Sequence, residues 1–288
     1  MIERSSTNQT GIDEKDPPIG LVAGNGDLPM EFVQNVRASG RRCVVVANIG
    51  EADPEIEKIA SHIEWVKVGE LGRIIKTLIK HGVQEVAFLG GITRINLFGG
   101  VKLDLRGMGL IAKLRSLKDD VLLRGIAGEL ERDGLKVIEP QRFLSESVPS
   151  VGYLSSRKLG RDERSDVAIG WETAGALGAQ DVGQTVVVGH GLVLALEAVE
   201  GTDRCIVRGG ELGKGSAIVV KRCKPQQDLR LDLPTIGPKT IHGMISSGCR
   251  ALVVEAGKSL IVKKAEVVEL ANRNKISLVA ISSLNDIS

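Results

Sequence analysis

Short apolar runs alternate with segments of helical spacing along the first half of the chain. The apolar runs predict buried strands at 19–23, 43–47, 62–68 and 86–89. Between them, residues 30–40 and 71–80 carry apolar side chains at helical spacing and end near a glycine. Strand, helix and strand in this order are typical of βαβ units, whose strands pair in parallel. The pattern predicts a Rossmann-like parallel sheet with helices over residues 19–142, after a flexible polar tail at 1–18.

Residues 105–123 form a basic amphipathic stretch, and a further helical segment runs on through residue 130. A helix packed on the sheet is favoured over a surface that faces lipid. Val137 and Ile138 are expected to form the last strand of the first domain. Residues 143–160 contain Pro149 and several serines, and we interpret them as a linker and hinge.

The second half has a different order of elements. A helix is expected up to Leu177, and a hairpin follows over 185–198 with its turn at 189–191. Further elements are expected at 217–220, 251–255, 264–272 and 278–281. The sequence thus predicts an α/β protein of two domains, with a C-terminal mixed α/β catalytic domain over 161–288 and the active site in the interdomain cleft.

The amino-acid composition argues against some classes of binding partner and against a membrane-spanning segment. The chain has 288 residues, 42% of them hydrophobic, which is ample for two packed cores. A net charge of +2 and an aromatic content of 2% argue against a nucleic-acid binder. The four scattered cysteines lack metal-ligand spacing and are interpreted as buried thiols in a reducing compartment. No apolar run approaches the roughly 20 residues that cross a bilayer. A cytoplasmic protein is expected, with any membrane contact peripheral.

The turn after the first strand contains Gly24, Asn25 and Gly26, which are candidates for substrate binding. Glycines there let backbone amides approach a phosphate or a sugar at the start of the following helix. The dinucleotide fingerprint is absent because Pro29 occupies its third glycine position. A tight strand-to-helix turn without a ligand is the alternative. Thr93 and Arg94 follow the strand at 86–89 and are candidates for the same crevice, where Arg94 would hold a phosphate or form a surface salt bridge.

A second group of polar residues follows the hairpin. Glu200, Thr202 and Asp203 add carboxylates and a hydroxyl at an expected strand end, which suits a metal or a sugar. The alternative is that Asp203 caps a helix.

Residues 224–240 concentrate charges, prolines and glycine between two apolar segments. Asp228 and Asp232 offer hard oxygen ligands to Mg²⁺ or Mn²⁺, while cations including Lys224 can face phosphate. Thr240 is expected to cap a helix that begins at Ile241. A solvated connector is the alternative interpretation. Thr235 and Gly237, in the same stretch, are further candidates for substrate contacts.

Three segments carry a resemblance to a known family: GLVAGNGDLP at 20–29, EGTDRCIVRGG at 200–210 and KPQQDLRLDLPTIGPKTI at 224–241. In this order they resemble the LpxI family of UDP-2,3-diacylglucosamine pyrophosphatases. The resemblance implies a Mg²⁺-dependent hydrolase of lipid A biosynthesis with two domains and the substrate between them. Water attacks the α-phosphorus, giving UMP and 2,3-diacylglucosamine 1-phosphate. The catalytic and metal-associated aspartate of this family falls on Asp232, and no role is carried over to Asp228.

The leading hypothesis is that Asp232 binds a Mg²⁺ that bridges the pyrophosphate, with Asp203 and Glu200 completing the metal site. Lys224 and Arg94 would offset charge on the phosphate oxygens. Two rival functions stay open, a sensor that binds a nucleotide sugar without turnover and a nucleotide-sugar transferase. Peripheral contact with the inner membrane and a homo-oligomer are both compatible with the sequence.

Overall fold

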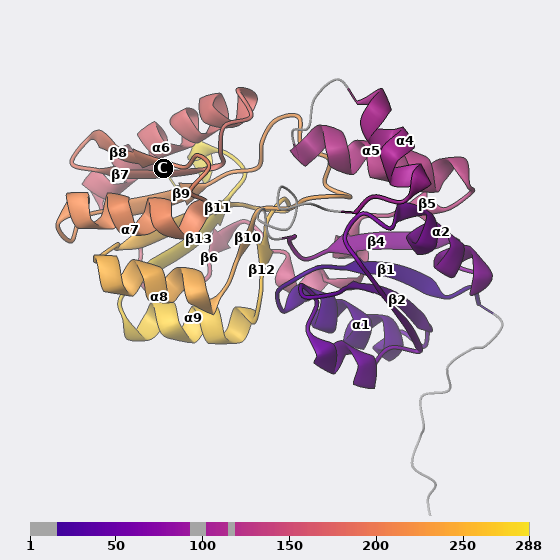
Figure 1. The fold of residues 1–288 in the computed structure, drawn as a ribbon. Helices are drawn as coiled ribbons and strands as arrows, with labels where there is room; N and C mark the ends of the chain where they lie inside the picture. The colour runs from indigo at the N-terminus through magenta and orange to yellow at the C-terminus, as the bar shows by residue number, and fades with distance from the viewer. Residues whose placement is uncertain (1–15, 93–101, 115–118, 288) are drawn as a thin grey trace, which may run out of the picture. The chain divides into compact units, whose positions relative to one another are not determined.

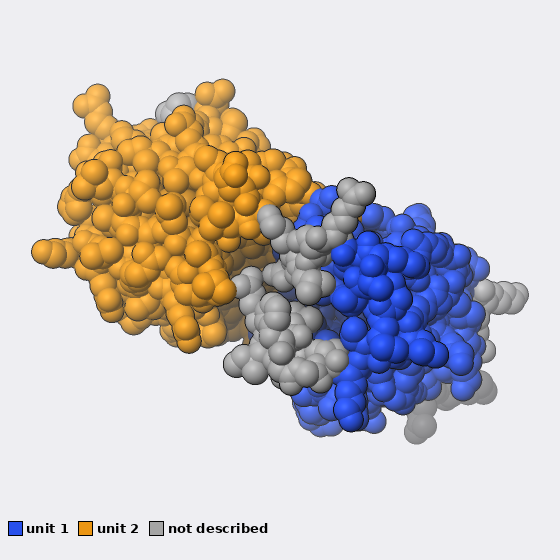
Figure 2. Space-filling model, turned by 45° about the horizontal axis from the view of Figure 1, so that its top comes forward, with its two compact units in different colours: residues 1–144, 230–232 blue, residues 145–229, 233–288 orange. Residues whose placement is uncertain are grey.

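The computed structural model describes residues 16–92, 102–114 and 119–287. The chain folds into two compact units, which Figure 2 shows in different colours. Unit 1 comprises residues 1–144 and 230–232, and unit 2 comprises residues 145–229 and 233–288. Most of the expected linker at 143–160 therefore belongs to unit 2, and a short segment of the second half belongs to unit 1.

The sheet of unit 1 is entirely parallel, as the βαβ pattern predicted. Its strands are β1 (Ile19–Ala23), β2 (Cys43–Asn48), β3 (His62–Val66), β4 (Glu85–Leu89) and β5 (Lys136–Val137). Their order is β3-β2-β1-β4-β5, so the strand order reverses between β1 and β4. β1 and β2 are buried along their whole length, which explains why both appear in the sequence as continuous apolar runs. The predicted Rossmann-like architecture is confirmed.

Helices cover both faces of this sheet (Figure 1). They are α1 (Leu28–Ala38), α2 (Leu71–Lys80), α4 (Leu105–Lys113) and α5 (Asp119–Arg132), with short 3₁₀ helices at Pro54–Lys58 and Pro140–Phe143. α1 lies on one face, where its fully buried Phe32 meets the ring of Phe143 edge-on at 5.3 Å. The core on the other face joins side chains of α2, α4 and α5 to Val44, Val46 and Val86 of the strands.

Two charged residues at the start of α4 connect it to its neighbours. The carboxylate of Asp104 accepts hydrogen bonds from the Gly107 amide at 2.8 Å and from the Gly72 amide of α2 at 2.6 Å. Arg106 donates to Glu129 at 3.1 Å and pairs with Asp133, which joins α4 to α5. Burial alone would raise the pKa of Glu129, but the hydrogen bond from Arg106 and nearby cations lower it. The hydrogen bond from Arg106 also lowers the pKa of Asp133.

This ion-pair network predicts a loss of stability in acid. A carboxylate whose pKa is lowered by folding stabilises the fold above its unfolded pKa, and that stability is lost as the pH falls through the folded pKa. Arg106→Gln should lower the free energy of unfolding by about 2 kcal/mol at pH 7 through the lost hydrogen bond to Glu129, which is 5% exposed, and the difference from wild type should shrink below the ordinary pKa of glutamate. Urea unfolding of a Trp171→Phe background, in which Trp65 of β3 reports on unit 1, measures this effect. An unchanged difference in acid would contradict the assignment.

Unit 2 is built on a mixed sheet. Its strands are β6 (Gly152–Tyr153), β7 (Thr185–Gly189), β8 (Leu192–Leu196), β9 (Ile218–Lys221), β11 (Ala251–Glu255) and β13 (Ser277–Ile281). The order is β6-β13-β11-β9-β7-β8, with β9, β11 and β13 parallel and the others antiparallel to their neighbours. A separate pair consists of β10 (Thr235–Ile236) and β12 (Leu260–Ile261). The predicted hairpin and the mixed α/β class are confirmed.

The helices of unit 2 also lie on both faces of their sheet (Figure 1). They are α6 (Arg161–Ala179), α7 (Thr202–Gly213), α8 (Pro238–Ser247) and α9 (Lys264–Arg273), with short 3₁₀ helices at Ser145–Ser147 and Leu284–Ile287. α6 covers one face with Val167, Trp171 and Ala174, while the other three cover the opposite face. All four cysteines of the chain are buried free thiols, as expected. Within the described ranges, no helix has both the length and the apolar character needed to span a membrane.

Candidate functional site

The reversal of strand order in unit 1 places two glycine-containing turns together. Open α/β sheets bind ligands at such a reversal, beyond the carboxyl ends of the strands. Gly24, Asn25 and Gly26 follow β1, and Gly90 and Gly91 follow β4. Asn25 and Gly91 form an isolated antiparallel bridge, so the two turns are held against each other. Thr93 and Arg94 lie outside the described residues.

Gly24 acts in backbone packing in this structure. It is buried, and its amide donates to the Leu89 carbonyl at 2.8 Å, while the Asn25 amide donates to the Gly91 carbonyl at 2.8 Å. A Cβ at position 24 would lie 2.3 Å from the Gly91 oxygen. These two amides are therefore used in hydrogen bonds between the turns. Gly26 is exposed and has a φ of 99°, which glycine adopts readily.

The side chain of Asn25 points to an acid that the sequence analysis did not select. Its amide nitrogen donates to Glu51 at 2.8 Å, and Glu51 is only 8% exposed. A second amide, that of Asn48, donates to the Ala23 carbonyl at 2.9 Å and ties the ends of β1 and β2 together. The position of Glu51 just after an apolar strand could have marked it as a candidate in the sequence. Its burial could not be predicted, because it depends on contacts with residues that are distant in sequence.

In unit 2, Thr202 belongs to a buried chain of polar groups. Lys221, the last residue of β9, donates to the Thr202 hydroxyl at 2.7 Å, and that hydroxyl donates to Glu197 at 2.8 Å. Lys221 and Glu197 are 4% and 8% exposed. Thr202 thus bridges two buried charges. Its hydroxyl, which the sequence predicted to contact substrate, has a structural role here. Lys221 and Glu197 were not predicted, although a lysine directly after the apolar run of β9 was visible.

This bridge predicts a specific stability effect. Thr202→Val keeps the shape of the side chain but removes the hydroxyl between the two buried charges. We expect the free energy of unfolding to fall by about 2 kcal/mol. Thr235→Val is the matched control, because the Thr235 hydroxyl donates to the nearby Leu233 carbonyl at 2.9 Å and a change of about 0.5 kcal/mol is expected. Urea unfolding followed by Trp171 fluorescence compares the two, and equal losses would contradict the bridging role.

The two candidate metal ligands of the EGTD segment are each engaged by a cation. Glu200 accepts from Arg208 at 2.7 Å, and this hydrogen bond lowers the pKa of Glu200. Asp203 pairs with Lys239 at 2.7 Å and lies in the first turn of α7, whose N-cap is Gly201. The alternative of Asp203 as a helix cap is therefore wrong. Across residues 16–92, 102–114 and 119–287, no group of three acidic, histidine or cysteine side chains suits a metal ion. Both carboxylates are thus paired with cations, and their assignment to a metal stays a prediction.

Lys224, Thr235 and Gly237 lie at separate places in unit 2. Lys224 follows β9 and pairs with Asp181 at 2.7 Å, so its charge is partly compensated. Thr235 begins β10, and Gly237 is the N-cap of α8. α8 starts at Pro238, not at Ile241, and the Thr240 hydroxyl accepts from the Gly237 amide at 3.4 Å. Thr240 therefore supports the cap from inside the first turn, which corrects its predicted position.

Asp232 is exposed at the end of the segment that belongs to unit 1. Its neighbour Leu231 is 9% exposed and packs in the core of unit 1, and Arg230 pairs with Glu131 of α5 at 2.8 Å. These two contacts hold the backbone before Asp232 while leaving its carboxylate at the surface. Mg²⁺ commonly takes one or two carboxylates together with substrate phosphates and water. The assignment of Asp232 to a metal stays a prediction.

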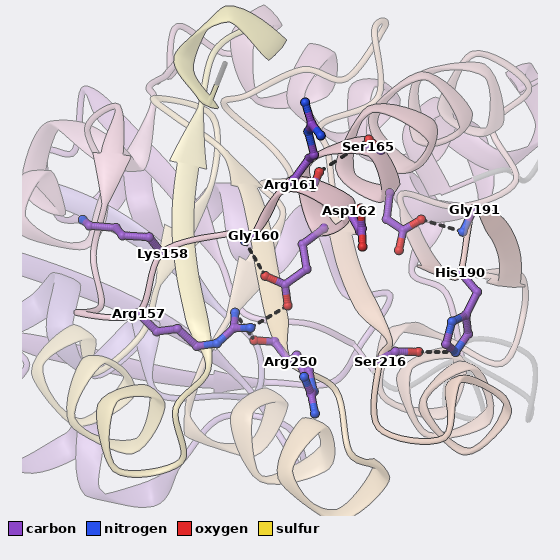
Figure 3. Close-up of a pocket in the computed structure, with 12 residues that line it drawn as sticks. Arg157, Lys158, Gly160, Arg161, Asp162, Ser165, His190, Gly191, Ser216 and Arg250 are labelled. Atoms are coloured by element: carbon purple, nitrogen blue, oxygen red, sulfur yellow. Dashed lines mark hydrogen bonds and ion pairs between the residues drawn. The ribbon is translucent and has the colours of Figure 1, made fainter.

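A cavity of 760 Å³ also lies within unit 2 (Figure 3). Its lining includes Ser216 and Arg250, which precede β9 and β11, and therefore lies at the amino ends of these strands. Arg157 pairs with Glu163 at 2.6 Å, and the Glu163 carboxylate also accepts from the Gly160 amide at 2.8 Å. In Figure 3 Lys158 and Arg161 extend away from the other lining residues. None of the candidate residues from the sequence lines this cavity.

Comparison with known proteins covers both units. Residues 18–147 match the LpxI N-terminal domain, and residues 150–279 match the LpxI C-terminal domain. The UDP-2,3-diacylglucosamine pyrophosphatase LpxI of Caulobacter vibrioides is 34% identical over 265 residues, which cover 88% of this chain and 94% of that protein.

Two solved structures match parts of the chain with much lower similarity. A UDP-glucose-4-epimerase from Stenotrophomonas maltophila is 12% identical, with a TM-score of 0.28, and the match covers 42% of this chain and 35% of that one. An ADP complex of N5-carboxyaminoimidazole ribonucleotide synthetase is 12% identical, with a TM-score of 0.27, and covers 68% and 45%. The matches span less than half of either solved chain. The similarity in both domains to LpxI shows that this chain belongs to the LpxI family.

Proposed function

We propose that this protein hydrolyses the pyrophosphate bond of UDP-2,3-diacylglucosamine, giving UMP and 2,3-diacylglucosamine 1-phosphate for lipid A biosynthesis. The observation that carries the proposal is the 34% identity to a pyrophosphatase of that name over 94% of its length. The similarity extends over both domains, so it is not the result of a single shared domain. The location of the active site between the two domains stays a prediction.

Asp232 is the proposed catalytic residue. Its carboxylate is exposed, and the preceding Leu231 and Arg230 hold the backbone in place. A negatively charged side chain at this position can orient a water, or accept its proton, as the water attacks the α-phosphorus. Bound Mg²⁺ would neutralise charge on the pyrophosphate, with Asp232 as its protein ligand. Mn²⁺ is expected to substitute, since both ions prefer oxygen ligands.

Lys224 and Arg94 are proposed to face the phosphate oxygens. The ion pair between Lys224 and Asp181 orients the ammonium group, and the Asp181 carboxylate reduces its net charge before substrate binds. Gly26 and Asn25, both exposed after β1, are proposed contacts for the nucleotide part. Thr235 and Gly237 are also proposed to contact the substrate.

Incubation with UDP-2,3-diacylglucosamine and Mg²⁺ in ¹⁸O-labelled water tests the reaction. Label in UMP, read by mass spectrometry, is expected because attack at the α-phosphorus leaves the new oxygen on UMP. Label in the lipid phosphate would retain a hydrolase but overturn the site of attack. Binding without turnover would instead support the sensor, and turnover that needs an added acceptor would support the transferase.

A further inference from the structure

Three large apolar side chains are exposed close together on unit 1. Ile79 near the end of α2, Leu105 at the start of α4 and Met108 one turn later are 48%, 85% and 49% exposed. Ile79 and Leu105 line one groove of 690 Å³ between these two helices, together with Lys76 and Lys80. Only Gly107 and Leu110 of α4 are buried, so much of this short helix faces outward. We call Lys76, Ile79, Lys80, Leu105 and Met108 the α2–α4 patch.

Among the residues that line the groove, the four cations Arg73, Lys76, Lys80 and Arg106 outnumber the two carboxylates of Asp104 and Asp133. The carboxylates that line or border the groove are held by amides or by arginines, namely those of Asp104, Asp133, Glu64 and Glu70. Lys76 and Lys80 both have exposed side chains, and neither forms an ion pair within the part of the chain that the structure describes. Two ammonium groups on flexible stems thus flank the apolar side chains of Ile79 and Leu105.

We propose that the α2–α4 patch docks the protein on a lipid bilayer that carries acidic headgroups. Aliphatic side chains that project from a helix surface can enter the boundary of the acyl chains, while neighbouring lysines bind the negative headgroups. A second copy of this chain fits less well, because a two-fold contact through the patch would bring the same uncompensated lysines together. The inference rests on the proposed function, whose substrate carries two acyl chains and is delivered from a membrane.

Co-sedimentation with vesicles tests the proposal without substrate. We expect the protein to sediment with phosphatidylcholine vesicles containing about 30% phosphatidylglycerol, and at least fivefold less with phosphatidylcholine alone, since the headgroup charge supplies part of the attraction. The double variant Ile79→Gln and Leu105→Gln should reduce the bound fraction at least fivefold. The variant Lys76→Gln and Lys80→Gln should also bind the acidic vesicles less, and its binding should depend less on salt than that of the wild type, because the attraction that salt screens is removed.

Matched controls carry the same chemical changes on α7 of unit 2. Leu212→Gln removes a side chain that is 57% exposed, and Arg204→Gln removes an exposed cation. Both should sediment like the wild type. The proposal is overturned if the wild type does not bind the acidic vesicles, or if the patch variants bind as well as the controls. It is also overturned if analytical ultracentrifugation shows a dimer that Leu105→Gln dissociates, because the patch would then be covered by a second copy.

A detergent assay separates this inference from the proposed function. With substrate dispersed in detergent micelles, the patch variants should release UMP at the wild-type rate, while on vesicle-embedded substrate they should be at least fivefold slower. Vesicle binding without UMP release in either assay would refute the function and leave the docking surface. UMP release in micelles without vesicle binding would support the proposed function and refute the docking surface.

Discussion

Asp232→Asn should lower the rate of UMP release by at least about a hundredfold, the size of effect seen when a group that acts on the transition state is lost. Asparagine keeps the size and the hydrogen-bonding shape of the side chain but removes its charge. Asp232 is exposed, so the substitution should leave the free energy of unfolding within about 0.5 kcal/mol of the wild type. The loss should appear in kcat at saturating substrate and Mg²⁺, because the charge is needed during the reaction.

Asp228→Asn is the matched control for this result. Asp228 lies four positions earlier in the same segment and is partly buried, and no catalytic role is proposed for it. Its substitution should change kcat less than fivefold. Initial rates of UMP formation, with thermal unfolding of each variant, measure both effects. A similar loss in both variants would show that turnover depends on the overall negative charge of the segment and not on Asp232 in particular. Near-normal turnover in Asp232→Asn would contradict the assignment of Asp232 as the catalytic residue.

Many of the helices and strands of this chain could be predicted because strands such as β1, β2 and β7 are short buried apolar runs, whereas α7 was not expected from the sequence. β1 and α2 have the bounds expected from the sequence, and the hairpin of β7 and β8 follows from two apolar runs around His190 and Gly191. Both turn residues have positive φ, at 56° and 75°, which matches the tight turn. These features depend on neighbours in the sequence, which is why local patterns sufficed.

The candidate site was harder to predict because its residues are occupied by partners distant in sequence. Asp203 meets Lys239, and Thr202 meets Lys221, across gaps that no local pattern encodes. Leu231 gives the clearest case. Its segment lies in the second half of the sequence, yet it packs in the core of unit 1, so the boundary expected from composition does not describe where Asp232 is held.

Gly24→Ala should cost about 3 kcal/mol or more of the free energy of unfolding, the upper range for a group forced into a packed site. The new Cβ would lie 2.3 Å from the Gly91 carbonyl oxygen and 2.9 Å from backbone atoms of Gly90. Backbone cannot rotate away as a side chain can, so relief requires separating the ends of β1 and β4. The substitution should therefore also disturb the turn that carries Asn25 and Gly26.

Two other glycines of unit 1 provide a scale for this loss. Gly26→Ala meets no atom within 4 Å but keeps a φ of 99°, and about 1 kcal/mol of strain is expected. Gly128→Ala, in α5, also meets no atom within 4 Å and should stabilise the helix by about 0.5–1 kcal/mol. The predicted order of stability is Gly128→Ala, wild type, Gly26→Ala and then Gly24→Ala.

Trp65 and Trp171 allow this order to be assigned to one unit. Trp65 lies in β3 of unit 1 and Trp171 in α6 of unit 2, and the chain has no other tryptophan. In a Trp171→Phe background, urea unfolding of Gly24→Ala should shift the Trp65 transition strongly, while in a Trp65→Phe background the Trp171 transition should move less. If Gly24→Ala proved no less stable than Gly26→Ala, the close approach of the two turns would not constrain position 24, and a ligand contact would again be the better account of this glycine.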